Sequence, residues 1–286
     1  MRLPYLIILF CLFAFPSYAE ENAEKPIEVP KGQFEDLKHT KTNRVDKVID
    51  GLTVLLKDKT IIRLASLDIP DFHIWRNAPH SEAALKLLEE KLPEGTEVMI
   101  YQTRMAKKGR LNRMNHQLGH IVTKKDELWI QGLLLSHGLA RVYVAPDATE
   151  MIGQMYETEQ KARDNNLGIW SEESDFPLLN PDNISQAMGE MAVVEGTVEK
   201  AATVRNNIYL NFGKDWKTDF TIMMTPTLRK DLARKGINLM NLSGKKIRVR
   251  GFVREYNGPL IELDVAEHLE YPLPSADEKP ILKPNP

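Results

Sequence analysis

Two hydrophobic periods alternate along the first half of the chain. Between residues 45 and 67, short β-branched and apolar runs are separated by Asp-Gly and Lys-Asp-Lys turn sequences, a pattern typical of an antiparallel meander. Helical spacing then predicts helices over 81–90, with Ser81 as N-cap, 130–137 and 148–165. The predicted strands are 45–49, 53–56, 60–67, 98–102 and 119–123.

This order of elements predicts the fold class of the first domain. Strands that come before the helices packed across them indicate an α+β domain at 42–172, compatible with a five-stranded barrel of the oligonucleotide-binding (OB) type. A second β-rich region at 188–272 has short strands, glycines at bends and one helix over 225–233, and we predict an OB-like β-barrel there. Polar segments complete the chain: a flexible leader at 20–41, a linker at 173–187 and a disordered tail at 273–286.

The N-terminus predicts export. Arg2 precedes an apolar run that ends at Ser17-Tyr18-Ala19, the layout of a cleavable signal peptide over residues 1–19. We therefore expect a periplasmic or secreted protein with no integral membrane segment after cleavage. The single cysteine, Cys11, lies inside this segment, so the mature protein is expected to contain no disulfide bond.

The net charge of the chain does not indicate nucleic-acid binding. The formal net charge is −2, whereas nucleic-acid-binding domains are usually basic. Any attraction for phosphate must therefore be local. The best candidate patch consists of Lys107, Lys108, Arg110 and Arg113, although such a cluster is usually a solvated loop.

Several motifs occur in one order. Asp50-Gly51-Leu52-Thr53 is followed by Arg63 and by Asp68-Ile69-Pro70-Asp71. Farther along stand Trp129-Ile130-Gln131-Gly132, His137-Gly138-Leu139-Ala140-Arg141 and Leu167-Gly168-Ile169-Trp170. Together they resemble the staphylococcal nuclease (thermonuclease) family.

The resemblance implies a calcium-dependent phosphodiesterase site. In that family, calcium is held by the second Asp of Asp-Gly-Asp-Thr and by the Asp and the Thr carbonyl of Asp-Thr-Pro-Glu, whose Glu acts on the water. Here the metal positions become Leu52, Asp68 and the carbonyl of Ile69, and the water-handling position becomes Asp71, which is one methylene shorter. Calcium takes oxygen ligands, so Leu52 cannot replace a carboxylate.

The phosphate clamp of the family has two arginines. Arg63 matches the first, and gap-free spacing to Trp129 puts His116 at the second. Matching Arg110 to the second arginine would require a six-residue insertion before the next strand, although Arg110 could also fold back and substitute for it. His116 and His120, four residues apart, could form a transition-metal pair, but a surface or groove histidine is the preferred interpretation because no cysteine or carboxylate lies between them.

The second domain offers candidate base-stacking residues. Tyr209, Phe212, Trp216 and Phe220 lie near Lys245, Arg248 and Arg250 in sequence, and OB-type barrels bind single strands with aromatic side chains in a basic groove. Alternation in 209–212 predicts equally that these aromatics fill the core.

These observations leave three hypotheses. The first is an exported nuclease-like protein with a degenerate catalytic site, which needs no cofactor and binds single-stranded nucleic acid or an envelope protein. The second is an active metal-dependent endonuclease in which Arg63 and Asp71 act on the substrate and calcium is bound through Asp68. The third is a protein-interaction scaffold.

Overall fold

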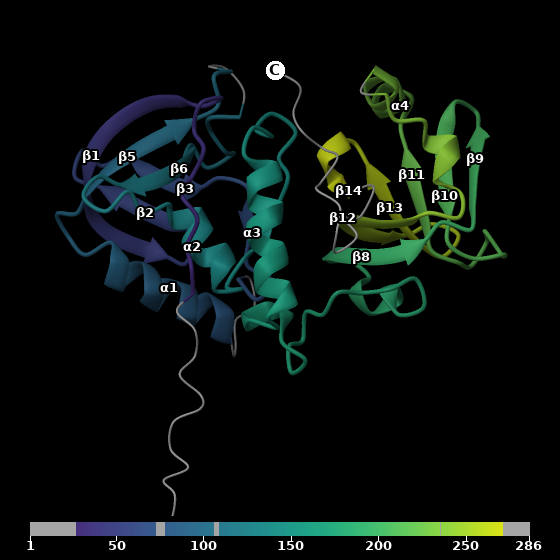
Figure 1. Cartoon of the computed structure of the whole chain (residues 1–286), viewed down its shortest axis with the longest axis horizontal. Coiled ribbons are helices and arrows are strands. Elements are labelled where there is room, and N and C mark those ends of the chain that lie inside the picture. The colour runs from purple at the N-terminus through teal and green to yellow at the C-terminus, as the bar shows by residue number, and fades with distance from the viewer. Residues whose placement is uncertain (1–26, 73–77, 106–108, 235, 271–286) are drawn as a thin grey trace, which may run out of the picture.

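The computed structural model describes residues 27–72, 78–105, 109–234 and 236–270. Two domains lie side by side, with α3 (Ile152–Asp164) between the first barrel and the strands of the second domain (Figure 1). The predicted signal peptide, the disordered tail, Lys107 and Lys108 lie outside the described residues.

The first domain is the predicted five-stranded closed barrel. Its strands pair in the order β1-β2-β3-β6-β5, with β3 and β6 parallel and the other pairs antiparallel. The long β1 closes it, because its first half pairs with β5 and its second half with β2. The strands are β1 (Lys38–Asp50), β2 (Thr53–Leu56), β3 (Ile61–Leu64), β5 (Glu97–Gln102) and β6 (Gln117–Thr123).

The barrel begins earlier than the sequence pattern suggested. β1 starts at Lys38, Leu37 is buried, and the Phe34 ring stacks on Tyr101 with 4.5 Å between ring centroids. Part of the predicted leader therefore packs on the barrel, because Phe34 finds a partner on β5, Tyr101, that a short sequence window cannot reveal.

Two other helices cover the barrel, α1 (Pro79–Lys91) and α2 (Ile130–Ser136). The prediction that Ser81 caps α1 is wrong, since the helix begins at Pro79 and Ala78 provides no side-chain cap. Asp71 takes that role from outside the helix. Its carboxylate accepts hydrogen bonds from the backbone N–H groups of His80 at 2.8 Å and Ser81 at 3.0 Å, and from the Ser81 hydroxyl at 2.7 Å.

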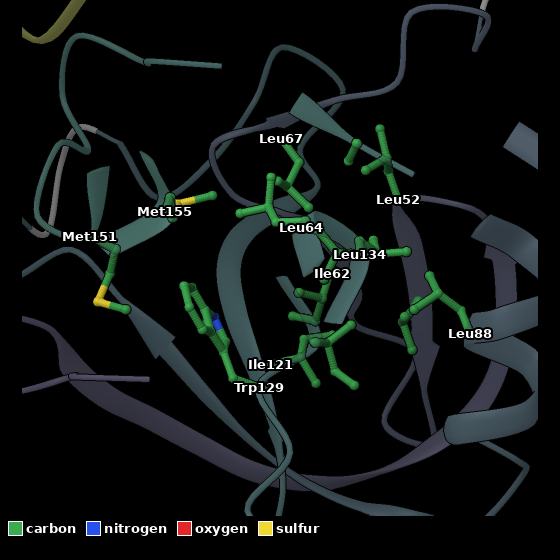
Figure 2. Close-up of a cluster of buried hydrophobic side chains, with 14 of the residues drawn as sticks. Leu52, Ile62, Leu64, Leu67, Leu88, Ile121, Trp129, Leu134, Met151 and Met155 are labelled. Carbon is green, nitrogen blue, oxygen red and sulfur yellow. The ribbon is translucent and has the colours of Figure 1, made fainter. Parts of the chain in front are cut away.

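The core of the first domain runs from the barrel interior to the helices. Leu52, Leu88 and Trp129 belong to one cluster of buried apolar side chains, part of which is shown in Figure 2. His120 lies beside it, buried, with its Nδ1 accepting a hydrogen bond from Trp129 Nε1 at 3.3 Å. The prediction of a surface or groove histidine is therefore corrected for His120, because the rings of Phe34 and Trp129 lie against it, at 6.2 and 6.1 Å between ring centroids.

The second domain is a further β domain. Its described strands form one seven-stranded sheet, and α4 (Pro226–Arg234) contacts β10 of that sheet. The strands pair in the order β8-β12-β13-β11-β10-β9. If β8 and β9, which follow each other in the chain, are taken together as the counterpart of the long β1, this is the strand order of the first barrel. The parallel pair β11 with β13 corresponds to β3 with β6. This order is consistent with the OB-like prediction, and a short two-residue strand, β14 (Leu269–Glu270), adds to β12. The other strands are β8 (Met191–Thr197), β9 (Lys200–Val204), β10 (Asn207–Asn211), β11 (Thr221–Met224), β12 (Lys246–Glu255) and β13 (Pro259–Leu263).

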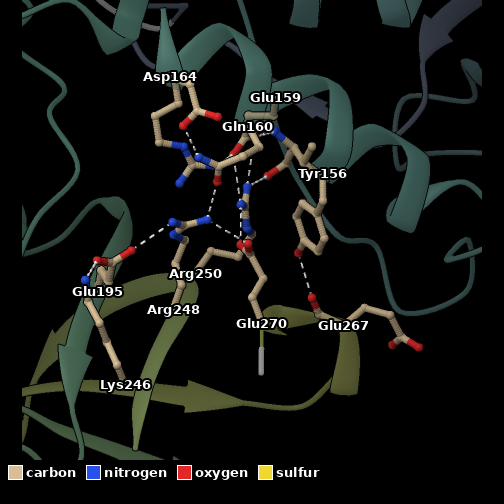
Figure 3. Close-up of polar contacts among 12 residues, drawn as sticks. Tyr156, Glu159, Gln160, Asp164, Glu195, Lys246, Arg248, Arg250, Glu267 and Glu270 are labelled. Carbon is tan, nitrogen blue, oxygen red and sulfur yellow. Dashed lines mark hydrogen bonds and ion pairs between the residues drawn. The ribbon is translucent and has the colours of Figure 1, made fainter. Parts of the chain in front are cut away.

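A buried ionic junction joins the domains (Figure 3). Arg250 of β12 is 0% exposed and donates to both carboxylate oxygens of Glu159 on α3, at 3.1 and 2.9 Å, and to the Val142 carbonyl at 2.8 Å. Burial opposes the charge of Glu159, but attraction to Arg250 and Arg163 outweighs it and lowers the Glu159 pKa to about 2. Both groups are therefore charged at neutral pH, and the domains are fastened to each other by a desolvated ion pair.

In the described part of the chain, no helix has the length and apolar character needed to cross a bilayer.

Candidate functional site: the nuclease-like site

The β2–β3 pairing brings the first arginine to the β1–β2 turn. Thr53 pairs with Arg63, and the Leu64 N–H donates to the Leu52 carbonyl at 2.8 Å. Arg63 Nη1 donates to Thr53 Oγ1 at 3.0 Å and lies 3.5 Å from Asp50 Oδ1. The register of the strands thus joins residues 50–53 and Arg63 at one place.

Arg63 is largely engaged inside the protein. Its guanidinium lies 4.5 Å from the centroid of the Phe72 ring, and its side chain is only 23% exposed. Burial lowers the pKa of Arg63, while the carboxylates of Asp50 and Asp68 oppose that shift. The side chain remains cationic, because an arginine titrates far above neutral pH.

The retained carboxylate, Asp68, has an internal partner. It lies on β4 (Leu67–Asp68), which pairs antiparallel with β7 (Arg141–Val142), so that Asp68 stands opposite Arg141. Arg141 Nε donates to Asp68 Oδ2 at 2.8 Å. Sequence reasoning missed Arg141 as a site residue, because only the pairing of strands some seventy positions apart brings it there.

Leu52 and Ile69 are both part of the core. Each is 0% exposed. Ile69 Cδ1 would lie 3.1 Å from a Cβ placed on Gly51, so the space beside the turn is filled with hydrocarbon. A helix residue, Ala84, closes it from the other side, with its Cβ 2.9 Å from the same point.

Asp71 is equally withdrawn from solvent. It is 1% exposed, and both of its oxygens accept the hydrogen bonds that cap α1. A carboxylate that is to position or deprotonate a water molecule needs a free oxygen within hydrogen-bond reach of that water. The residue at the water-handling position therefore serves to begin a helix.

Comparison with known families agrees with the fold of the first domain. Residues 61–172 match the family described as "Staphylococcal nuclease homologue". This part of the chain is a staphylococcal nuclease-like domain. The match begins at the first residue of β3 and includes Arg63 and Asp68, but not Leu52. None of the curated proteins is significantly similar to the chain.

The family resemblance assigns the second clamp position to His116. β3 and β6 are parallel, with Arg63 beside Leu118. Continued by one residue beyond β6, strand alternation puts His116 on the face of Leu118 and hence of Arg63. Two hydrogen bonds join His116 to Asn112. The backbone N–H of His116 donates to Asn112 Oδ1 at 3.0 Å, and the backbone N–H of Asn112 donates to the His116 carbonyl at 3.0 Å.

Arg110 does not take the place of the missing arginine. Its Nε donates to the Thr103 carbonyl at 2.7 Å, which ties the loop to the end of β5. Arg113 is exposed on the same loop. Two residues of the predicted basic patch are thus described. Arg113 is exposed, whereas Arg110 is hydrogen-bonded within the fold.

The residues at the metal position do not fit calcium. Calcium in proteins takes about 6 to 8 oxygen ligands, whereas here one position is a buried leucine and the remaining carboxylate is bonded to Arg141. Within residues 27–270, apart from the undescribed gaps, no cluster of three or more His, Cys, Asp or Glu side chains is placed to hold a metal. The described side chains at these positions therefore do not supply the set of oxygen ligands that calcium requires.

The candidate stacking residues of the second domain fall into two groups. Phe220 is 1% exposed and Phe212 packs against the core, so the core interpretation is correct for both. Tyr209 and Trp216 line a surface cleft. The placement of Arg248 and Arg250 beside a nucleic-acid groove is wrong, because both are buried at the domain junction, where they pair with carboxylates.

Proposed function

We propose that this chain is an exported nuclease-like protein that lacks calcium-dependent phosphodiesterase activity and acts by binding nucleic acid. The observation that carries the proposal is the full burial of Leu52 and Ile69 in the core, because a buried hydrocarbon side chain supplies no oxygen ligand to calcium. Export rests on the signal-like sequence of residues 1–19. Nucleic acid as the partner rests on the nuclease-like domain.

The chemistry of the remaining side chains supports the loss of catalysis. Phosphodiester hydrolysis needs a cation at the phosphate, donors for transition-state charge and a base for water. Removal of one well-placed transition-state donor commonly costs about 100 to 1,000-fold in rate. This domain departs from that set at three positions, Leu52, Asp71 and His116.

The test is a cleavage and binding assay on the mature protein. Labelled single-stranded DNA and RNA are incubated with the protein in calcium or in chelator, and the products are separated on a gel. We expect no cation-dependent cleavage, together with binding that weakens as salt is raised. Calcium-dependent cleavage that disappears in Asp68→Ala would refute the proposal and support the endonuclease hypothesis.

The same assay separates binding from a scaffold role. A protein-interaction scaffold predicts neither cleavage nor salt-sensitive binding of oligonucleotides. Under that outcome, an envelope protein becomes the better candidate for the partner.

A further inference from the structure

The outer face of the second domain is hollowed into a cleft of ≈ 690 Å³. Its floor consists of alternate residues of β9, β10 and β11: Tyr209 stands opposite Ala202, and Asn211 stands between Lys200 and Thr221. The intervening residues Ile208 and Leu210 face the core. The cleft therefore follows from strand alternation, and its volume is within the ~300–1,000 Å³ range of ligand pockets.

Three aromatic rings surround this floor. Trp216, 57% exposed, stands on the β10–β11 loop, and Tyr256, 60% exposed, follows β12. Tyr209 lies on the floor opposite Ala202, whose side chain is too small to cover it. Exposed aromatic side chains gathered in one concavity are a mark of binding sites.

The two walls are held against each other. Gly258 has φ +87°, and a Cβ there would lie 2.3 Å from the Thr218 carbonyl oxygen, so the β12–β13 turn sits directly on the β10–β11 loop. Within that loop, Asp215 Oδ1 accepts the Lys217 N–H at 3.0 Å, and Asp219 Oδ2 accepts the Asp215 N–H at 2.7 Å. Backbone held in this way lowers the entropy cost of binding, because Trp216 and Tyr256 are carried on ordered turns.

The charge of the cleft is mildly positive. Lys200 and Lys214 line it together with Glu199. Neither lysine forms an ion pair with any residue in the part of the chain that the structure describes. Lys217 lies 5.8 Å from the centroid of the Trp216 ring, which adds a cation above an aromatic face.

These features select among ligand classes. In a duplex the bases are already stacked on each other, so their faces are not free for Trp216. A peptide that adds a strand needs an exposed sheet edge, whereas the cleft lies on a sheet face. Unpaired bases provide flat apolar faces, and the phosphates between them provide a low density of negative charge, which matches three rings and two lysines.

We propose that this cleft binds a short single-stranded segment of nucleic acid, with bases stacked on Trp216, Tyr256 and Tyr209 and phosphates beside Lys200 and Lys214. The inference rests on the proposed function and locates its binding step in the second domain. It also predicts a modest salt dependence, because two lysines, Lys200 and Lys214, line the cleft.

The test uses fluorescence anisotropy of labelled oligothymidine and oligouridine of about 12 nucleotides, within the range of known single-strand sites. Loss of one stacked base costs about 5 to 160-fold in affinity, so Trp216→Ala/Tyr256→Ala is expected to weaken binding at least ~10-fold. The matched control is Phe252→Ala, which truncates an aromatic side chain that is 61% exposed and outside the cleft. It is expected to leave affinity unchanged.

A second pair of variants tests the lysines. The slope of log affinity against log salt is about −0.7 per phosphate neutralised on a single strand, so Lys200→Ala/Lys214→Ala is expected to reduce the slope by about 1.4. Lys230→Ala, an exposed lysine of the same domain that lies on α4 and outside the cleft, is the control with an unchanged slope. Thermal unfolding of each variant verifies that the fold is retained.

Different outcomes refute different statements. If the wild-type protein binds and the cleft variants bind equally well, the cleft proposal is wrong; loss of binding in Arg113→Ala would then move the site to the nuclease-like domain and leave the proposed function intact. If the wild-type protein binds no oligonucleotide, the proposed function fails as well. If a neutral N-acetylglucosamine oligomer changes tryptophan fluorescence, in a manner lost in Trp216→Ala, and oligothymidine does not, the cleft takes a glycan and the inference is overturned.

Discussion

Restoring the missing carboxylate with Leu52→Asp is the most direct test of the nuclease-like site. If the site lacked only one ligand, this variant would bind calcium. In the structure, the Leu52 side chain is 0% exposed and packs in the main core cluster. We therefore expect Leu52→Asp to destabilise the domain and to create no calcium site.

The expected loss follows from two terms. Truncation of a buried leucine costs about 2–5 kcal/mol, and burial of an unpaired carboxylate costs several kcal/mol more or forces its protonation. A loss of at least ~4 kcal/mol is a large share of the ~5–15 kcal/mol that stabilises an ordinary domain. Leu52→Ala measures the cost of lost packing alone. Leu52→Asn supplies a polar side chain with the shape of aspartate but without its charge.

Urea denaturation in calcium and in chelator provides the measurement. A ligand at 100 times its Kd stabilises the folded state by about 2.7 kcal/mol, so a created site would rescue Leu52→Asp in millimolar calcium. We expect equal free energies of unfolding in both solutions. Rescue by 1 kcal/mol or more, absent in Leu52→Asn, would refute the reasoning and show an intact site with one ligand missing.

The pH dependence distinguishes charge from shape. Burial raises the folded-state pKa of a carboxyl above its usual value of about 3.9. A group with a raised folded pKa loses its contribution to stability as pH rises, so the difference between Leu52→Asp and Leu52→Asn should be smallest below about pH 4 and grow toward neutral pH. A difference independent of pH would mean that the aspartate reaches solvent.

Three further predictions concern residues that hold the fold. Arg250→Met leaves Glu159 buried with fewer partners and should cost about 3–5 kcal/mol in urea denaturation, and Glu159→Gln in the same chain should restore part of this loss. Since the Glu159 pKa is lowered to about 2, the contribution of the ion pair to stability is full above the ordinary pKa of a glutamate and is lost as pH falls toward 2. A free energy of unfolding that Arg250→Met leaves unchanged would contradict this. Burial lowers the pKa of His120 to about 3, so the free energy of unfolding should fall as pH decreases from about 6.5. His120→Gln should remove up to ~3 kcal/mol of this loss between about pH 6.5 and 4.5. Parallel profiles of unfolding free energy against pH for the wild-type protein and His120→Gln would refute this prediction. Asp71→Ala removes the acceptor for three donors at the start of α1 and should lower the free energy of unfolding by about 1–3 kcal/mol, whereas an effect below ~0.5 kcal/mol in thermal or urea unfolding would show that the carboxylate is not the cap.

Local pattern predicted most of the elements in the first domain. The runs at 53–56 and 119–123 became β2 and most of β6, and the 130–137 run became α2, because alternation and helical spacing are properties of adjacent residues. Predictions that needed a partner from elsewhere in the chain were weaker. Ser81 has the composition of an N-cap, yet Asp71 does the capping from ten residues earlier.

The second domain shows the same limit more strongly. Arg248 and Arg250 stand in a basic, β-branched strand, a sequence equally suited to a nucleic-acid groove and to an ionic junction. Their burial against Glu195 and Glu159 depends on how the two domains meet, and composition carries no information about that. The cleft with Trp216 likewise depends on two loops far apart in sequence that pack together.

The sequence by itself determined that the chain contains a nuclease-like barrel, and the motif resemblance assigns Leu52 to a position that holds a calcium ligand in the family. Only the tertiary structure decided the consequence. It shows Leu52 packed in the core, Asp68 bonded to Arg141 and Asp71 used as a helix cap. The physical reason is that a carboxylate's chemistry depends on its solvent exposure and its hydrogen-bond partners, and those partners come from strands and helices that only the folded chain brings together.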